Sequence, residues 1–277
     1  MEQIDLHKVL KTKSPKLYKW LPNFLINLLG KVIHLKEMNH VIAIFDGKTG
    51  ADFAQSVVEY LKIEKNIVFV DESKIVPNEK YVFISNHPLG GLDGLLLTSE
   101  ITKRYGPSKF IVNEILMGLE PMRNVFVPVN NLGTASKSSI ELIKDLYLSD
   151  NQVLNFPAGA CSRLIKGKIQ DLQWKKSFVK QAEQYERKIV PIFFGGKNSR
   201  HFYWISKIRM ALGIKAFIEM ILLPDEMFRQ RNAKFDIVIG EPISPKELKE
   251  SGKSYSQICE EIREIVYKNG TRYSTYR

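Results

Sequence analysis

The stretch Tyr81–Thr98, YVFISNHPLGGLDGLLLT, joins a short β-rich run to an apolar helical run through a turn that contains two glycines. The run from Tyr81 to Ser85 predicts a strand, and the leucines after Asp93 predict a helix. His87 therefore follows a strand and precedes a carboxylate by six positions. This strand–turn–helix unit is the starting point for predicting both the fold and the site.

The spacing of His87 and Asp93 requires a turn if the two side chains are to meet. On an unbroken helix they would lie roughly 240° apart. Gly90 and Gly91 allow backbone angles closed to other residues, so the loop can bring the pair together. Asp93 would then accept the proton of one imidazole nitrogen and leave the other as a base that activates a hydroxyl. The alternative is that Asp93 only N-caps the helix and His87 is a polar turn residue.

Other β-rich runs alternate with helical periodicity along the chain. This alternation predicts an α/β fold with a mainly parallel central sheet flanked by helices. Ligands bind such sheets beyond the carboxyl ends of the strands, where His87 and the sequence FPAG both fall. The predicted strands are 66–70, 81–85, 109–113, 125–129, 152–156, 189–194 and 235–239. The predicted helices are 24–35, 53–63, the segment after His87 to about Arg104, 114–122, 137–148, 174–186 and one within 245–269.

The 277 residues carry a formal charge of +11, which predicts attraction to an anionic membrane surface or to nucleic acid. Basic residues, Trp20 and the apolar helix 24–35 are typical of an interfacial anchor, although a helix packed on the core fits equally well. No stretch reaches the roughly 20 apolar residues that span a bilayer, and the charged N-terminus is unlike a signal peptide. We expect a basic helical extension over 1–50 that associates with the membrane, and one α/β domain over 51–277.

The two cysteines, Cys161 and Cys259, lie far apart and show no metal-ligand spacing. This usage suits a reducing cytoplasm and predicts no metal site. Cys161 as a nucleophile with His87 as its base is one alternative. A small residue in a tight loop is the interpretation that we prefer.

The sequence FPAGACSR, residues 156–163, directly follows a predicted strand. Gly159 permits close backbone approach, exposed N–H groups there would bind an anion, and Arg163 adds positive charge. The alternative is an ordinary strand-to-helix loop.

Three further segments combine cations or apolar residues in ways that suggest contacts with lipid. Lys175 and Lys176, beside Trp174, could hold phosphates of an acyl donor or of lipid, or form a solvated helix face. NSRHFYW, residues 198–204, is typical of a membrane interface or of base stacking. FIEMILL, residues 217–223, could line an acyl tunnel, although core is the preferred interpretation.

The motifs SNHPLGGLD, FPAGACSR, VPIFFGGKNSRHFY and IGEPI, in this order, resemble the glycerolipid acyltransferase superfamily, which includes lysophosphatidate acyltransferases. The resemblance covers about 21–245 and is nearest to a hemolysin-like, lysophospholipid acyltransferase-like branch that includes an O-acyltransferase for bacterial amino-acid lipids. It implies an enzyme without metal or resident cofactor that transfers a fatty acyl chain from acyl-CoA or acyl-carrier protein to a lipid hydroxyl. The expected partners are the donor and membrane lipids at the cytoplasmic face of the membrane, and no nucleic acid.

The resemblance also assigns roles to particular residues. His87 matches the catalytic base, Asp93 the carboxylate that orients it, and 190–192 a later VPI motif. The candidate substrate-binding residues are those that match the family's FPEGTRS motif or supply nearby polar groups. They are Phe156, Pro157, Gly159, Ser162, Arg163, Lys109, Asn130 and Lys176.

Three departures from the family pattern bear on the acceptor. Five residues rather than the usual four separate His87 from Asp93, Ala158 and Cys161 replace a glutamate and an arginine, and Asn130 stands where an arginine is expected. Arg163 or Lys109 are candidates to compensate for the missing arginines. The pattern favours a lyso-lipid with a non-phosphate or carboxylate head, such as a monoacylated amino-acid lipid.

Two other classes of function remain open at this point. A basic peripheral membrane- or nucleic-acid-binding protein without catalysis would explain the charge and the aromatic segment. A hydrolase would give the acyl group to water.

Overall fold

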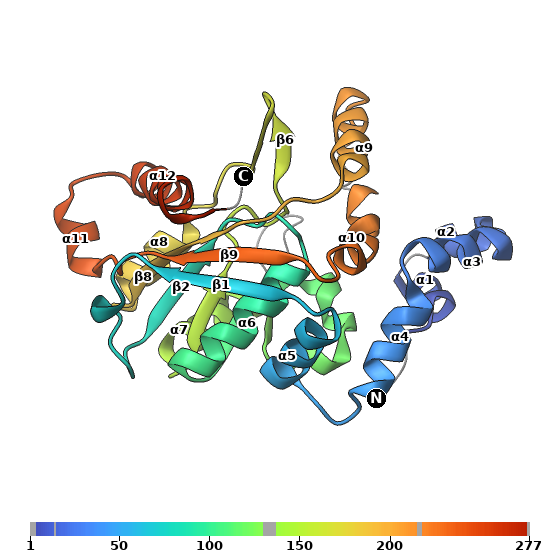
Figure 1. Ribbon diagram of the computed structural model, residues 1–277, viewed down its shortest axis with the longest axis horizontal. Helices are drawn as coiled ribbons and strands as arrows, with labels where there is room; N and C mark the ends of the chain where they lie inside the picture. The colour runs from blue at the N-terminus through green and yellow to red at the C-terminus, as the bar shows by residue number, and fades with distance from the viewer. Residues whose placement is uncertain (1–3, 14, 130–136, 215–217, 276–277) are drawn as a thin grey trace.

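A seven-stranded sheet forms the centre of the protein (Figure 1), and the computed structural model describes residues 4–13, 15–129, 137–214 and 218–275. The strand order is β1-β9-β8-β2-β5-β3-β4. The last five strands in this order run parallel, whereas β9 pairs antiparallel with β8 and parallel with β1. The strands are β1 (Glu64–Phe69), β2 (Tyr81–Ser85), β3 (Ser108–Asn113), β4 (Phe126–Val129), β5 (Gln152–Asn155), β8 (Lys188–Phe194) and β9 (Lys234–Ile239). The predicted α/β fold with a mainly parallel sheet is confirmed.

Helices cover both faces of this sheet. All five residues of β2 are buried, as expected for a strand covered on two sides. One apolar cluster joins the sheet to α5 and α6, and a second joins it to α7, α8 and α12. The helices are α1 (Leu6–Lys13), α2 (Pro15–Trp20), α3 (Asn23–Val32), α4 (Leu35–Ile44), α5 (Gly50–Tyr60), α6 (Leu92–Tyr105), α7 (Lys137–Leu148), α8 (Ser177–Gln184), α9 (Arg200–Ala211), α10 (Leu223–Arg229), α11 (Pro245–Glu250) and α12 (Tyr255–Tyr273).

The N-terminal helices α1–α4 lie at one end of the molecule, beside α10 (Figure 1). The helix predicted over 24–35 ends early, because His34 adopts a left-handed backbone (φ 52°) and α4 begins after it. His34 Nε2 lies 2.8 Å from Asp225 Oδ1 of α10. Val41 and Ile42 of α4 are buried in the core, so part of the predicted extension packs against the α/β domain.

Several local elements differ from the sequence-based expectation. A hairpin of β6 (Arg163–Ile165) and β7 (Lys168–Gln170) lies between the FPAGACSR loop and α8, where no strand was predicted. The segment 114–122 forms short 3₁₀ helices, Glu114–Gly118 and Glu120–Met122, instead of an α-helix. A further 3₁₀ helix, η4 (Ile218–Leu222), precedes α10.

Candidate active site

His87 lies in the loop between β2 and α6, two residues beyond the end of β2. The neighbouring Asn86 fixes this loop, since its side-chain amide donates to the Phe194 carbonyl at 2.9 Å and its Oδ1 accepts from the Phe194 N–H at 2.7 Å. Phe194 is the last residue of β8, so the loop is tied to the next strand. His87 therefore lies at the edge where the parallel strands end, as the sequence predicts.

Asp93 lies in the first turn of α6 and contacts His87. With Nδ1 protonated, His87 donates to Asp93 Oδ2 at 3.0 Å. Two backbone N–H groups of the loop donate to the same oxygen at 2.9 and 3.3 Å, and the Gly94 N–H donates to Oδ1 at 2.9 Å. The carboxylate is fully buried, and its donors hold it in one orientation. The N-cap of α6 is Gly91, so the alternative of Asp93 as the N-cap is wrong.

This contact engages Nδ1 of His87 and leaves Nε2 available. Asp93 fixes the tautomer in which Nε2 carries a lone pair. Within the part of the chain that the structure describes, no residue forms a hydrogen bond with Nε2. The His87 side chain is 13% exposed.

Phe156, which directly follows the neighbouring strand β5, packs on the imidazole. The two rings are stacked, with centroids 3.9 Å apart and an interplanar angle of 18°. Phe110 of β3 packs its edge against Phe156 at 5.1 Å. Gly94 of α6 leaves room for Phe110, because a Cβ there would lie 2.7 Å from its ring. Phe156 therefore packs directly on His87, and its contact with substrate stays a prediction.

Asp171 joins the His87 loop to the FPAGACSR loop. Its Oδ1 accepts from the His87 backbone N–H at 3.1 Å and from Ser162 Oγ at 2.6 Å, and its Oδ2 accepts from Trp174 Nε1 at 2.8 Å. The Ser162 N–H also donates to the His87 carbonyl at 2.7 Å. Burial raises the pKa of the Asp171 carboxyl, although the hydrogen bonds from Ser162, Trp174 and His87 oppose this shift. Sequence reasoning missed Asp171, which is 84 positions from His87 and belongs to no recognised motif.

Pro157, Gly159 and Cys161 shape the FPAGACSR loop. Gly159 has a left-handed backbone (φ 66°), and its N–H donates to the Phe156 carbonyl at 3.0 Å. That N–H is engaged within the loop, so it is not one of the exposed donors predicted there. The Pro157 carbonyl accepts from the Lys175 N–H at 3.0 Å. Burial raises the pKa of the Cys161 thiol to about 11, which fits a small residue in a tight loop rather than a nucleophile.

Arg163 is fully buried, and its predicted contact with substrate does not fit this structure. Its Nη2 lies 2.8 Å from Glu219 Oε1, and Arg209 Nε of α9 lies 2.9 Å from Glu219 Oε2. Its guanidinium also lies over the Phe202 ring, 5.3 Å from the centroid. Arg163 therefore links the FPAGACSR loop to α9 and η4, and Glu219 is a core residue there.

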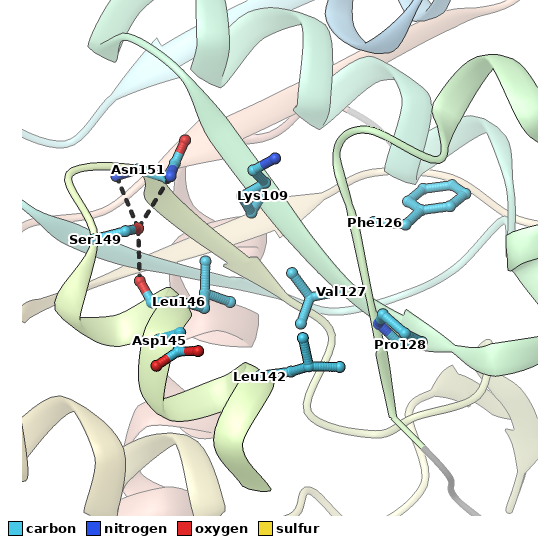
Figure 2. Close-up of a pocket in the computed structure, with 9 residues that line it drawn as sticks. All are labelled: Lys109, Phe126, Val127, Pro128, Leu142, Asp145, Leu146, Ser149 and Asn151. Atoms are coloured by element: carbon cyan, nitrogen blue, oxygen red, sulfur yellow. Dashed lines mark hydrogen bonds between the residues drawn. The ribbon is translucent and has the colours of Figure 1, made fainter. Parts of the chain in front are cut away.

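Lys109 lies far from His87, which contradicts its predicted role. It pairs in register with Val153, which pairs with Val82, and His87 lies five residues beyond Val82, roughly 16 Å along the strands. Lys109 instead donates to the Asn124 carbonyl. It lines a pocket of about 220 Å³ between β3, β4 and α7, in which His87 has no part (Figure 2).

Lys176 and Asn130 are the two remaining candidate substrate-binding residues. Lys176 is exposed at the start of α8, beside the loop that holds Trp174. Asn130 lies outside the described residues. The described part of the chain contains no cluster of three or more His, Cys, Asp or Glu side chains that could hold a metal ion. None of its helices is both long and apolar enough to cross a membrane.

The acyltransferase family matches residues 8–272, and the chain belongs to it. The protein is therefore an enzyme of acyl transfer, as the resemblance implied. Two curated relatives are lyso-glycine lipid O-acyltransferases. The one from Bacteroides thetaiotaomicron is 39% identical over 96% of this chain and 97% of its own length. The one from Phocaeicola vulgatus is 38% identical over 96% of this chain and 94% of its own.

A solved structure is also similar in outline. It is the 1-acyl-sn-glycerophosphate (LPA) acyltransferase PlsC from Thermotoga maritima, with a TM-score of 0.48 and 14% sequence identity. The likeness covers 90% of this chain and 97% of that one. At this distance it supports no inference about function.

Proposed function

We propose that this enzyme O-acylates a lyso-lipid, with a lyso-glycine lipid or a similar monoacylated amino-acid lipid as the acceptor. The observation that carries the proposal is the 3.0 Å contact between His87 Nδ1 and Asp93 at the carboxyl ends of the parallel strands. The names of the two curated relatives, each covered almost end to end, both give a lyso-glycine lipid as the acceptor. A binding protein without catalysis is not favoured, because the chain belongs to an enzyme family.

In the proposed reaction, His87 Nε2 removes the proton from the acceptor hydroxyl as its oxygen attacks the carbonyl carbon of an acyl thioester. The C–S bond then breaks, the thiolate takes the proton from the imidazolium, and the ester product leaves. Asp93 stabilises the imidazolium, which lowers the free energy of the transition state. The donor is acyl-CoA or acyl-carrier protein, and the backbone N–H of Gly91 at the start of α6 is our candidate for holding the oxyanion.

The proposed acceptor head group is inferred from charged residues that the family motif contains and this chain lacks. Ala158 and Cys161 stand where the family motif has a glutamate and an arginine, and the nearby Arg163 is buried against Glu219. A carboxylate head needs fewer cations than a phosphate monoester. We therefore expect lysophosphatidate to be a poor acceptor.

The proposed place of action is the inner face of the cell membrane. Helices α1–α3 carry no acidic residue between Leu6 and Val32, and they expose Trp20, Phe24 and Leu28. Cations beside exposed apolar residues favour an anionic lipid surface.

The decisive experiment replaces His87 with Ala and follows the acylated lipid by mass spectrometry. We expect the product to disappear while the protein stays folded. The free energy of unfolding should fall modestly, because alanine also removes the hydrogen bond to Asp93 and the stack on Phe156. His40→Ala, an exposed histidine on α4, is the matched control and should keep full activity. Undiminished product from folded His87→Ala enzyme would refute the mechanism, and free fatty acid in place of lipid product would indicate a hydrolase.

A further inference from the structure

Helix α9 is apolar on two opposite faces. Its inner face packs Phe202 against the protein core, where the ring is fully buried. Its outer face carries Trp204 and Ile208, four positions apart, and Leu212 caps its end; their exposed fractions are 63%, 38% and 69%. A helix at a protein–water surface normally presents polar residues outward. This exposed stripe therefore indicates a surface that something apolar covers.

Every residue of α9 with a permanent charge is positive. No aspartate or glutamate occurs from Arg200 to Leu212, and Arg200 and Lys207 are exposed beside Trp204. Tryptophan, aliphatic residues and cations together match the boundary between anionic lipid headgroups and acyl chains. Nucleic acid would match the cations and the tryptophan, but it offers nothing to Ile208 and Leu212.

The position of α9 connects this stripe to the active site. The helix follows β8, whose carboxyl end lies at the same edge of the sheet as His87. Gly196, between β8 and α9, packs closely against Leu89 of the His87 loop. The contact is so close that a Cβ added at Gly196 would lie only 3.2 Å from the leucine side chain. On its inner side, α9 is joined through Arg209 and Glu219 to the FPAGACSR loop.

Helix α9 also lies near the N-terminal helices. A pocket of about 440 Å³ lies between α3, α9 and α10; Val32 and Ile205 line it, together with Asp225 and Glu226 of α10. Val32 ends the exposed row of α3 that includes Phe24 and Leu28. Helix α9 and the end of the exposed row of α3 therefore face the same pocket.

We propose that α9 is a second membrane-binding element, which lays the His87 edge of the α/β domain on an anionic bilayer together with α3. This extends the membrane association proposed above from the N-terminal helices to the domain that carries the catalytic pair. A lyso-lipid would then reach His87 from the bilayer surface without crossing bulk water. Bilayer binding needs no turnover and is measured without substrates. Its outcome therefore tests this proposal independently of the proposed acyl transfer.

Tryptophan fluorescence of the full chain provides the direct test. The chain has three tryptophans, Trp20, Trp174 and Trp204, of which Trp174 is buried at 4% exposure. In Trp20→Phe, added anionic vesicles with brominated acyl chains should shift the emission of Trp204 to shorter wavelength and quench it. The double variant Trp20→Phe/Trp204→Phe keeps only Trp174 and should not respond. Absence of quenching in Trp20→Phe would overturn the proposal, as would a response to single-stranded nucleic acid but not to vesicles.

Vesicle cosedimentation gives a second, quantitative test. Replacing Trp204, Ile208 and Leu212 with serine should weaken partition into anionic vesicles at least about tenfold, since three apolar side chains no longer enter the lipid. The matched control replaces Val76, Ile140 and Ile265, which are exposed elsewhere on the protein, and should bind as the parent chain does. Equal binding by the α9 variant, or equal loss in the control, would overturn the proposal. So would a dimer that dissociates on the α9 substitutions while vesicle binding stays the same, because a second copy would then cover the stripe.

Discussion

The imidazole of His87 lies flat on the ring of Phe156, with centroids 3.9 Å apart and the planes inclined by 18°. Asp93 holds one ring nitrogen in position, but a single hydrogen bond leaves the ring free to swing about that contact. The stacked phenyl ring restricts this motion. The orientation of Nε2 therefore depends on two neighbours, one from α6 and one from the end of β5.

Phe156→Leu tests this dependence. We expect kcat to fall about tenfold, because loss of the stacking partner lets the base leave its reactive position. The free energy of unfolding should fall by only about 1 kcal/mol, since leucine keeps most of the buried apolar volume. Phe83→Leu removes a fully buried ring that stacks on Tyr105 instead, and it serves as the control. Steady-state kinetics in which both variants lose the same activity would show that the stack has no special role.

Asp93→Asn should lower kcat by about 10²- to 10⁴-fold, because a neutral amide no longer enforces the tautomer or stabilises the imidazolium. The loss should be smaller than in His87→Ala, which removes the base itself. We also expect the free energy of unfolding to fall by about 1–3 kcal/mol. In the parent chain, backbone N–H groups donate to both carboxylate oxygens of Asp93. In the variant, the amide N–H₂ group replaces one of these oxygens and cannot accept those hydrogen bonds.

Chemical denaturation and kinetics on the same preparation measure both effects. Asp52→Asn, in the first turn of α5, is the matched control for loss of a carboxylate near a helix N-terminus. Asp93→Asn enzyme with unchanged kcat would show that Asp93 only closes the loop.

The sequence predicted the site's central pair because His87 and Asp93 lie close together in the chain and a glycine turn separates them. It also predicted all seven strands of the central sheet, since each is a short apolar run bounded by turn residues. The antiparallel direction of β9 could not be predicted, because pairing sense depends on where the chain returns after α10. The sequence did not reveal the contacts of Asp171 with His87 and of Glu219 with Arg163 for a related reason, since these pairs are far apart in the chain.

Cys161→Ala should keep kcat within about threefold of the parent enzyme, because the proposed transfer forms no covalent enzyme intermediate. Burial raises the pKa of both cysteines, Cys161 and Cys259, to about 11, so neither thiol ionises appreciably near neutral pH. Native protein should accordingly resist iodoacetamide at pH 8, and urea-unfolded protein should react at both positions. A loss of activity of a hundredfold or more in folded Cys161→Ala would reinstate the nucleophile that we rejected.

Glu219→Gln should lower the free energy of unfolding by about 3–5 kcal/mol, because two buried guanidinium groups would lose the carboxylate that they share. Glu261→Gln is the control, since its ion pair with Lys253 is nearly half exposed and should contribute no more than about 1 kcal/mol. Equal effects of the two substitutions in urea denaturation would mean that the buried ion pairs do not hold α9 to the FPAGACSR loop.

Asp236 of β9 ties the sheet to the end of α12, and its contribution to stability should depend on pH. Burial by itself would raise the pKa of this carboxyl, but hydrogen bonds from Asn66, Thr275 and Ser274 lower it to about 2 from 3.8. Because the folded-state pKa lies below the unfolded value, the stabilisation is complete above about pH 4 and is lost as the pH falls toward 2. Asp236→Asn should therefore cost about 2 kcal/mol of unfolding free energy at pH 7 and at pH 5, and less at pH 3.

Urea denaturation of the parent and variant chains at these three pH values measures the difference directly. Asp150→Asn is the control, because Asp150 is 96% exposed beside Lys80 and its loss should hardly change stability at any pH. If the deficit of Asp236→Asn were the same at pH 3 as at pH 7, the lost stability would come from altered packing at the end of β9. A deficit that shrinks on acidification would instead identify the charge of Asp236 as the group that holds the end of α12 against the sheet.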